Sequence, residues 1–111
     1  MKVHSIVGPG LLESAYQAFL TRELQSRGFR VQSQVGLPAS YEGSRVDLGY
    51  RIALLVEDAL IVELKAVPKL LPVHEAQLLS YLKLSGCAVG LLINFNVPRL
   101  KDGVKRLVNG R

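Results

Sequence analysis

The segment Ala59–Val67 constrains the fold most, because it is an apolar run that contains one carboxylate and one ammonium. A short apolar run bounded by turn residues predicts a β-strand, whose side chains alternate between two faces. Glu63 and Lys65 therefore share one face of this strand. Because a buried ion pair rarely adds stability over apolar residues, the pair indicates a functional reason. The alternative is a strand at a sheet edge with its charged face toward solvent.

Periodicity along the rest of the chain predicts an α/β fold with the order helix, three strands, helix, strand. The predicted elements are a helix between Gly10 and Gly28, an extended segment from Phe29 that stops near Pro38, a turn at 40–43, strands at 46–56 and 60–67 joined by a turn at Glu57–Asp58, a helix from Pro72 to Gly86, and a strand at 88–95. The segment after Pro98 fits either a short helix or an edge strand. The succession of strand, helix and strand from Leu60 to Phe95 implies a right-handed crossover between parallel neighbours.

The length of 111 residues and the hydrophobic fraction of 49% fit one compact domain over residues 1–111. No apolar run approaches the roughly 20 residues that cross a bilayer, and the first residues lack a signal-peptide pattern. We therefore expect a cytoplasmic protein with no membrane partner. The single cysteine, Cys87, excludes an internal disulfide, and the sequence holds no Cys/His cluster for a metal.

The formal net charge of +5 favours a polyanionic partner such as nucleic acid. Near the end of the chain, Asp102 stands alone among basic residues. These are Arg99, Lys101, Lys105, Arg106 and Arg111. We expect Arg99, Lys101, Lys105 and Arg106 to contact phosphates. The alternative is a solvated chain end.

Carboxylates clustered with a lysine, and without His or Cys ligands, are typical of sites for hard cations such as Mg²⁺ or Mn²⁺. Such an ion can activate water beside a scissile phosphate, and a nearby ammonium stabilises the same developing charge. Glu63 is the candidate ligand, and Lys65 is the candidate for orienting the water or stabilising the transition state. Glu13 lies in the first turn of a helix, where a carboxylate interacts favourably with the positive end of the helix dipole. The alternative is that Glu13 is directed at a metal.

On the second predicted helix, His74, Gln77 and Tyr81 recur at steps of three and four residues and so share one face, distinct from the apolar stripe. Gln77 and Tyr81 are candidates for hydrogen bonds to a phosphate or a base. His74 fits a surface or helix-start position better than a catalytic one. The alternative for this face is an ordinary polar surface.

Several motifs, in one order along nearly the whole chain, resemble the GxxExxY proteins, a small branch of the PD-(D/E)XK nuclease superfamily. The matching segments are residues 10–16, 50–52, 62–67, 72–82 and 91–95, continuing to Gly103. The resemblance implies a restriction-endonuclease-like αβββαβ core with a mixed central sheet flanked by helices, which agrees with the order read from periodicity. It also implies Mg²⁺-dependent hydrolysis of phosphodiester bonds in nucleic acid, with DNA expected rather than RNA.

The resemblance implies a role for each matching residue. Glu13 corresponds to the acidic residue of the first helix, and Glu63 with Lys65 to the E-x-K pair. Gln77 and Tyr81 correspond to the Q-x-x-x-Y motif of RecB-like nucleases. The implied metal ligands are therefore Glu13 and Glu63, and the implied catalytic residues are Glu63, Lys65, Gln77 and Tyr81.

One position departs from the family pattern, because Ala53 stands where relatives carry an aspartate that is a principal metal ligand. A three-residue hairpin loop would set Ala53 directly opposite Glu63. Asp47 has the right parity but lies about 20 Å away along an extended strand, unless the strand bends sharply at Gly49. Asp58 lies at the turn. We therefore expect the metal site to be impaired.

We interpret the chain as a PD-(D/E)XK-type nuclease domain whose activity is weak or absent with Ala53 in place. The alternative, from another class, is a catalytically silent pseudoenzyme of the same fold that binds nucleic acid or protein. Relatives usually carry a further helical segment before Val3, so we expect a domain that is short at its N-terminus.

Overall fold

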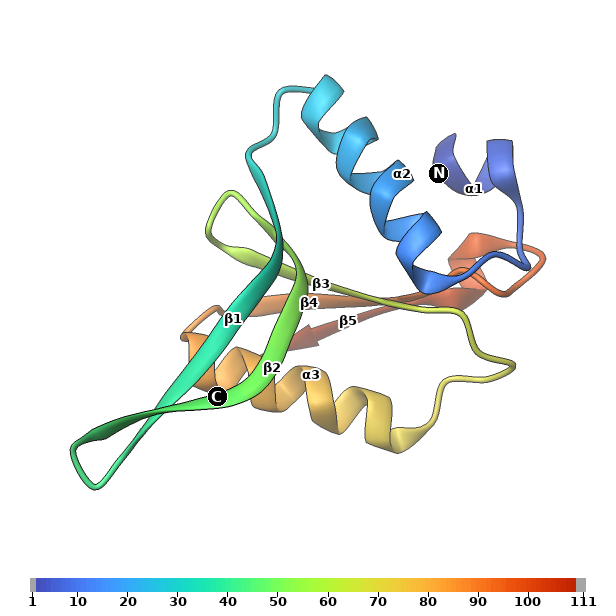
Figure 1. Cartoon of the computed structure of the whole chain (residues 1–111). Coiled ribbons are helices and arrows are strands. Elements are labelled where there is room, and N and C mark those ends of the chain that lie inside the picture. The colour runs from blue at the N-terminus through green and yellow to red at the C-terminus, as the bar shows by residue number, and fades with distance from the viewer. Residues whose placement is uncertain (1, 110–111) are drawn as a thin grey trace.

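The computed structural model describes residues 2–109, with the side chains of residues 4, 5, 7, 38–41, 47 and 48 excepted. It has the predicted mixed α/β architecture, a five-stranded mixed sheet flanked by helices (Figure 1). The helices are α1 (Lys2–Val7), α2 (Glu13–Ser26), α3 (Pro72–Ser85) and the short 3-10 helix η1 (Leu100–Gly103). The strands are β1 (Val31–Tyr41), β2 (Ser44–Val56), β3 (Leu60–Lys65), β4 (Val89–Asn94) and β5 (Val104–Val108).

The strands lie side by side in the order in which they occur along the chain. β1, β2 and β3 form an antiparallel meander, and α3 then leads to β4, which is parallel to β3. β5 returns antiparallel to β4 at the edge. Because β3 is the central strand, the alternative that placed Glu63 and Lys65 at a solvent-facing sheet edge is wrong.

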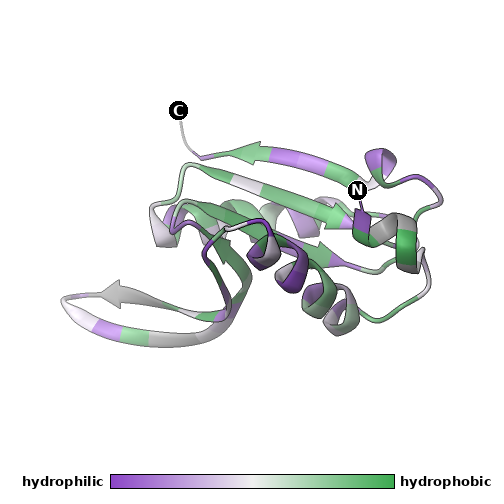
Figure 2. Cartoon of the chain, turned by 90° about the horizontal axis from the view of Figure 1, so that it is seen from above, coloured by the Kyte–Doolittle hydropathy of each residue, from purple (hydrophilic) through white to green (hydrophobic). Residues whose placement is uncertain are grey.

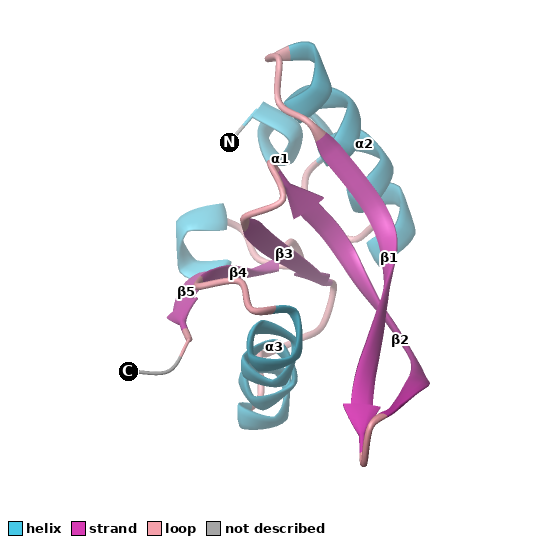
Figure 3. Cartoon of the chain, turned by 90° about the vertical axis from the view of Figure 1, so that its left-hand side faces the viewer, coloured by secondary structure: helices cyan, strands magenta, loops and turns pink. Residues whose placement is uncertain are grey.

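Each face of the sheet is covered by one helix. Tyr16 and Leu20 of α2 belong to one apolar cluster, and Leu78 and Leu82 of α3 belong to the other. Figure 3 shows α2 above and α3 below strand β3. Consecutive residues of β3 belong to different clusters, so this strand is buried on both faces and reads as a nearly continuous apolar run.

The β1–β2 hairpin is longer than predicted, and its distal part projects from the body of the molecule (Figure 2). β1 continues to Tyr41, so the predicted stop near Pro38 is wrong. Proline is tolerated here because β1 is an edge strand and its register with β2 shifts between Gly36 and Pro38. β2 pairs with β3 through Leu54–Val56 and then diverges from it, which leaves a fork between the two strands.

The remaining differences lie at the ends of elements. Both alternatives for the segment after Pro98 are present, since η1 is followed by the edge strand β5. The strand predicted for 60–67 ends at Lys65, and α1 was not predicted. No helix in the described part of the chain is long and apolar enough to span a membrane.

Candidate functional site

The register of the β2–β3 hairpin brings Ala53 beside Glu63. Leu54 pairs with Val62, so the loop at 57–59 makes Ala53 and Glu63 the next residues along the two strands, as predicted. Here the backbone N–H of Ala53 donates to Oε2 of Glu63 at 2.8 Å. The Glu63 side chain therefore spans the fork at the point where the two strands separate.

Glu63 is only 7% exposed, an uncommon place for a carboxylate. Burial raises the pKa of Glu63, while the Ala53 N–H and the Lys65 charge lower it and the Glu13 charge raises it again. Burial outweighs the favourable contacts, so the charged form of this carboxyl is less stable here than in an exposed side chain. Carboxyl groups perturbed in this way are typical of functional sites.

Helix α3 brings Gln77 and Tyr81 to the same place. Nζ of Lys65 donates to Oε1 of Gln77 at 3.3 Å. Burial raises the pKa of the Tyr81 hydroxyl, the charges of Glu63 and Tyr50 raise it further, and a hydrogen bond with Gln77 lowers it. Tyr81 is also a buried member of the apolar cluster under α3, so the prediction that this helix face is distinct from the apolar one is wrong.

Four of the predicted residues, Glu63, Lys65, Gln77 and Tyr81, therefore lie together beside Ala53, and we call this set the Glu63 site. Glu13, the exposed first residue of α2, is near enough for its charge to act on Glu63. His74 has a structural role at the start of α3. Its Nδ1 accepts the N–H of Leu71 at 2.9 Å and caps α3, the helix-start position that was expected.

Tyr16, the last residue of the matching segment 10–16, fixes the loop that leads into α2. Its hydroxyl donates to the carbonyl of Gly8 at 2.6 Å and accepts the N–H of Leu11 at 3.1 Å, and its ring stacks on Phe95. Gly10, in this loop, has a φ of 101°, which favours glycine. The glycine and tyrosine of the Gly-x-x-Glu-x-x-Tyr pattern thus position Glu13.

Asn94 fixes the chain on the other side of the site, and sequence reasoning missed this role. The buried amide accepts the N–H of Val67 at 3.2 Å and donates to the carbonyl of Val67 at 2.9 Å. These bonds hold the chain just beyond Lys65. The available signal was a polar residue at the end of the apolar strand β4.

The cations predicted to contact phosphates lie around η1 and on the edge strand β5, two strands from β3: Arg99, Lys101, Lys105 and Arg106. Figure 2 shows β5 as a hydrophilic strand along its middle. Lys105 pairs with Glu75 at 3.0 Å, and Arg99 with Asp102 at 3.5 Å. Within residues 2–109, none of these four cations makes a hydrogen bond or ion pair with a member of the Glu63 site.

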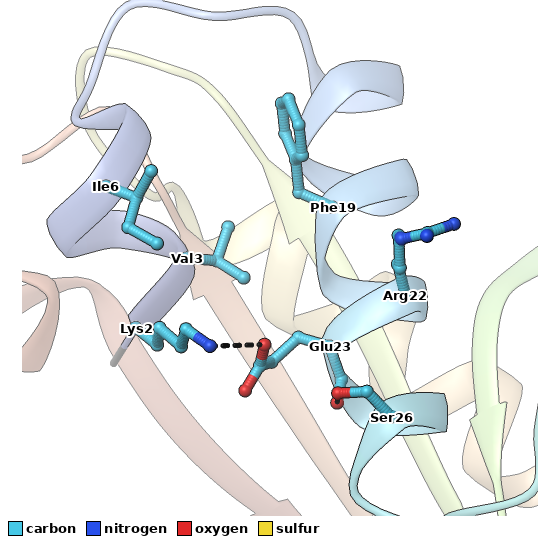
Figure 4. A pocket seen from close by; sticks show the side chains of 7 residues that line it. All are labelled: Lys2, Val3, Ile6, Phe19, Arg22, Glu23 and Ser26. Atoms are coloured by element: carbon cyan, nitrogen blue, oxygen red, sulfur yellow. Dashed lines mark hydrogen bonds and ion pairs between the residues drawn. The ribbon is translucent and has the colours of Figure 1, made fainter.

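Two pockets differ in their relation to the site. A groove of about 450 Å³, the tyrosine groove, shares two residues with it and is lined by Tyr50, Val73, Ala76, Gln77, Ser80, Tyr81 and Leu84. A pocket of about 290 Å³ lies between α1 and α2, where Val3 and Ile6 face Phe19 above the 3.5 Å ion pair of Lys2 with Glu23 (Figure 4). This second pocket contains none of the predicted site residues.

A family model for the PD-(D/E)XK nuclease superfamily matches residues 1–107 of the chain. The chain belongs to the PD-(D/E)XK nuclease superfamily. The match covers every residue of the Glu63 site. No curated protein and no solved structure matches the chain.

PD-(D/E)XK nucleases usually use Mg²⁺ or Mn²⁺, and the residues present do not fit a complete site for such an ion. Glu63 and Glu13 are the candidate ligands, but an oxygen of Glu63 is engaged by a backbone N–H, and Ala53 offers no carboxylate. Asp58 pairs with Arg30 at the hairpin turn, and the side chain of Asp47 lies outside the described part. Across the described residues, no group of three or more His, Cys, Asp or Glu side chains is placed to hold a metal.

Proposed function

We propose that this PD-(D/E)XK domain belongs to the GxxExxY, RecB-like branch and binds nucleic acid, DNA rather than RNA, at the Glu63 site. Its type of chemistry is metal-dependent hydrolysis of a phosphodiester bond, which we expect to be weak or absent with Ala53 in place. The observation that carries the proposal is the Lys65 ammonium, held by Gln77 beside a buried carboxylate. Buried ionisable groups of this kind rarely serve stability.

Each residue of the Glu63 site has a role in this proposal. Lys65 contacts a phosphate oxygen, and Gln77 orients Lys65 by accepting its hydrogen bond. The Tyr81 hydroxyl is a second donor to the phosphate. Glu63 and Glu13 supply part of a ligand set for Mg²⁺ or Mn²⁺. Arg99, Lys101, Lys105 and Arg106 hold more distant phosphates.

The test compares the chain with its Ala53→Asp and Ala53→Asn variants. Ala53→Asp adds a carboxylate beside Glu63 and should increase Mn²⁺ affinity and the cutting of plasmid or single-stranded DNA, measured by calorimetric titration and gel assay. Ala53→Asn has nearly the same shape without the charge and should do neither. Lys65→Met in the Ala53→Asp background should keep Mn²⁺ binding and lose cutting. An Ala53→Asp variant that neither binds Mn²⁺ better nor cuts would contradict the nuclease assignment.

A second candidate is a catalytically silent nucleic-acid-binding or protein-interaction module. The bond from the Ala53 N–H to Glu63 favours it, because the carboxylate is partly satisfied without a metal. Both forms of this candidate predict that Ala53→Asp leaves the chain unable to cut, and the nucleic-acid-binding form predicts in addition that the chain binds DNA.

A further inference from the structure

The tyrosine groove presents apolar surface to solvent beside the Glu63 site. Tyr50 is 49% exposed, and the α3 residues on its rim, Val73 and Leu84, are 64% and 41% exposed. The ring of Tyr50 lies 5.8 Å from that of Tyr81, tilted by 46°. Contiguous apolar surface with a polar rim is typical of a binding site.

The backbone of β2 is irregular at the point that directs Tyr50 into this groove. Its pairing with β1 jumps from Arg51 opposite Gly36 to Asp47 opposite Pro38, so β2 carries extra residues there. Gly49, within the irregular stretch, has a φ of 76°. Bulges of this kind re-aim a side chain and are frequent next to active sites.

The polar groups around the groove indicate what it binds. Gln77 and Ser80 offer hydrogen-bonding groups along one wall, and Gln77 also carries the bond from Lys65. An aromatic platform with amide and hydroxyl groups beside it fits a nucleobase, and an ammonium next to it fits the phosphate of the same strand. A base inside a duplex is stacked and paired, so its face cannot reach Tyr50.

We propose that the tyrosine groove binds an unpaired nucleobase stacked on Tyr50, with the adjoining phosphate at Lys65, so that the domain takes single-stranded nucleic acid. This inference rests on the proposed function, because it assumes that the Glu63 site contacts nucleic acid. The groove and the site then hold neighbouring parts of one strand.

The experiment measures binding of fluorescently labelled oligothymidylate by anisotropy. Tyr50→Leu should weaken binding roughly 5- to 100-fold, the loss typical of one stacked base. Tyr50→Phe keeps the ring and should bind as the unchanged chain does. Phe29→Leu removes a comparably exposed ring outside the groove and should also leave binding unchanged.

An oligonucleotide with abasic positions tests stacking on the unchanged chain, even where Tyr50→Leu fails to fold. It should bind more weakly than oligothymidylate of the same length, and a matched duplex should be insensitive to Tyr50→Leu. If oligothymidylate binds, Lys65→Met weakens it and Tyr50→Leu does not, the groove proposal is wrong and the proposed function stands. If the unchanged chain binds neither oligothymidylate nor duplex, both are wrong.

Discussion

The side chain of Glu63 accepts a backbone N–H of the neighbouring strand. In a regular sheet, a backbone carbonyl of the partner strand would accept that N–H. The Ala53 N–H lies where β2 separates from β3, and the carboxylate accepts it at 2.8 Å. A buried N–H without a partner is costly, so this bond stabilises the fork. The same residue is the candidate metal ligand, so its structural and chemical roles compete for one carboxylate.

The raised pKa of Glu63 leads to a prediction on stability against pH. Burial is the main cause, so between the ordinary value of 4.5 and the raised value the folded protein holds a proton that the unfolded chain has released. Stability therefore falls as pH rises through this window. Glu63→Gln can still accept the Ala53 N–H and does not titrate. At pH 7.5 it should be more stable than the unchanged chain by roughly 0.5–2 kcal/mol, a gain that disappears near pH 4.

Urea denaturation at the two pH values measures this difference. Glu42→Gln, at the exposed hairpin turn, is the control and should show no such gain. A Glu63→Gln variant that is less stable than the unchanged chain at neutral pH would mean that the carboxylate charge stabilises the fold.

At the scale of elements, buried side chains form hydrogen bonds to the loop before α2 and to the chain after β3. The Tyr16 hydroxyl bonds both Gly8 and Leu11 in the loop before α2. Asn94 does the same for the chain after β3. Both side chains are buried, so these bonds tie the loop before Glu13 and the chain after Lys65 to the core.

Tyr16→Phe tests this role. It removes one hydroxyl and leaves the Leu11 N–H and the Gly8 carbonyl without that partner, so the free energy of unfolding should fall by about 1–3 kcal/mol. Tyr50→Phe, on an exposed ring, should change it by less than about 0.5 kcal/mol. Equal stabilities in urea for Tyr16→Phe and the unchanged chain would contradict the structural role of the hydroxyl.

Sequence reasoning succeeded where local rules decide structure. The turn at Glu57–Asp58 fixes the register that sets Ala53 beside Glu63, and Pro72 and Gly86 mark the helix that carries Gln77. It failed where tertiary context decides. The continuation of β1 past Pro38 depends on its edge position, and the burial of Tyr81 depends on the hairpin that covers α3. No local sequence pattern predicts the hydrogen bond from the Ala53 N–H to Glu63 or the tyrosine groove.

At the scale of the whole molecule, the basic residues differ in how available they are to a polyanion. Lys105 and Arg99 already pair with Glu75 and Asp102. Lys101 and Arg106 are exposed, and in the described part of the chain they make no ion pair. Lys101 lies on η1 and Arg106 on the edge strand β5, two strands away from β3.

The salt dependence of oligonucleotide binding distinguishes the contribution of Arg106 from that of Lys105. Binding should weaken steadily between about 50 and 200 mM salt, because counterions are released from the phosphates. Arg106→Ala should reduce the slope of log affinity against log salt by up to about 1, and Lys105→Ala by less, since Glu75 already neutralises Lys105. Affinity that does not change with salt, measured by anisotropy, would contradict phosphate contacts.

The short attachment of β2 to β3, through Leu54–Val56, divides the molecule into a body and a projecting hairpin. Lys65 lies on the body, and Tyr50 lies on the hairpin. A ligand held at both would add a link between two parts that already meet through Leu54–Val56 of the sheet and through the contact of Tyr50 with Tyr81 of α3. Occupancy would then stabilise the packing of the hairpin against α3, so the bound strand would help to hold one wall of its own site in place.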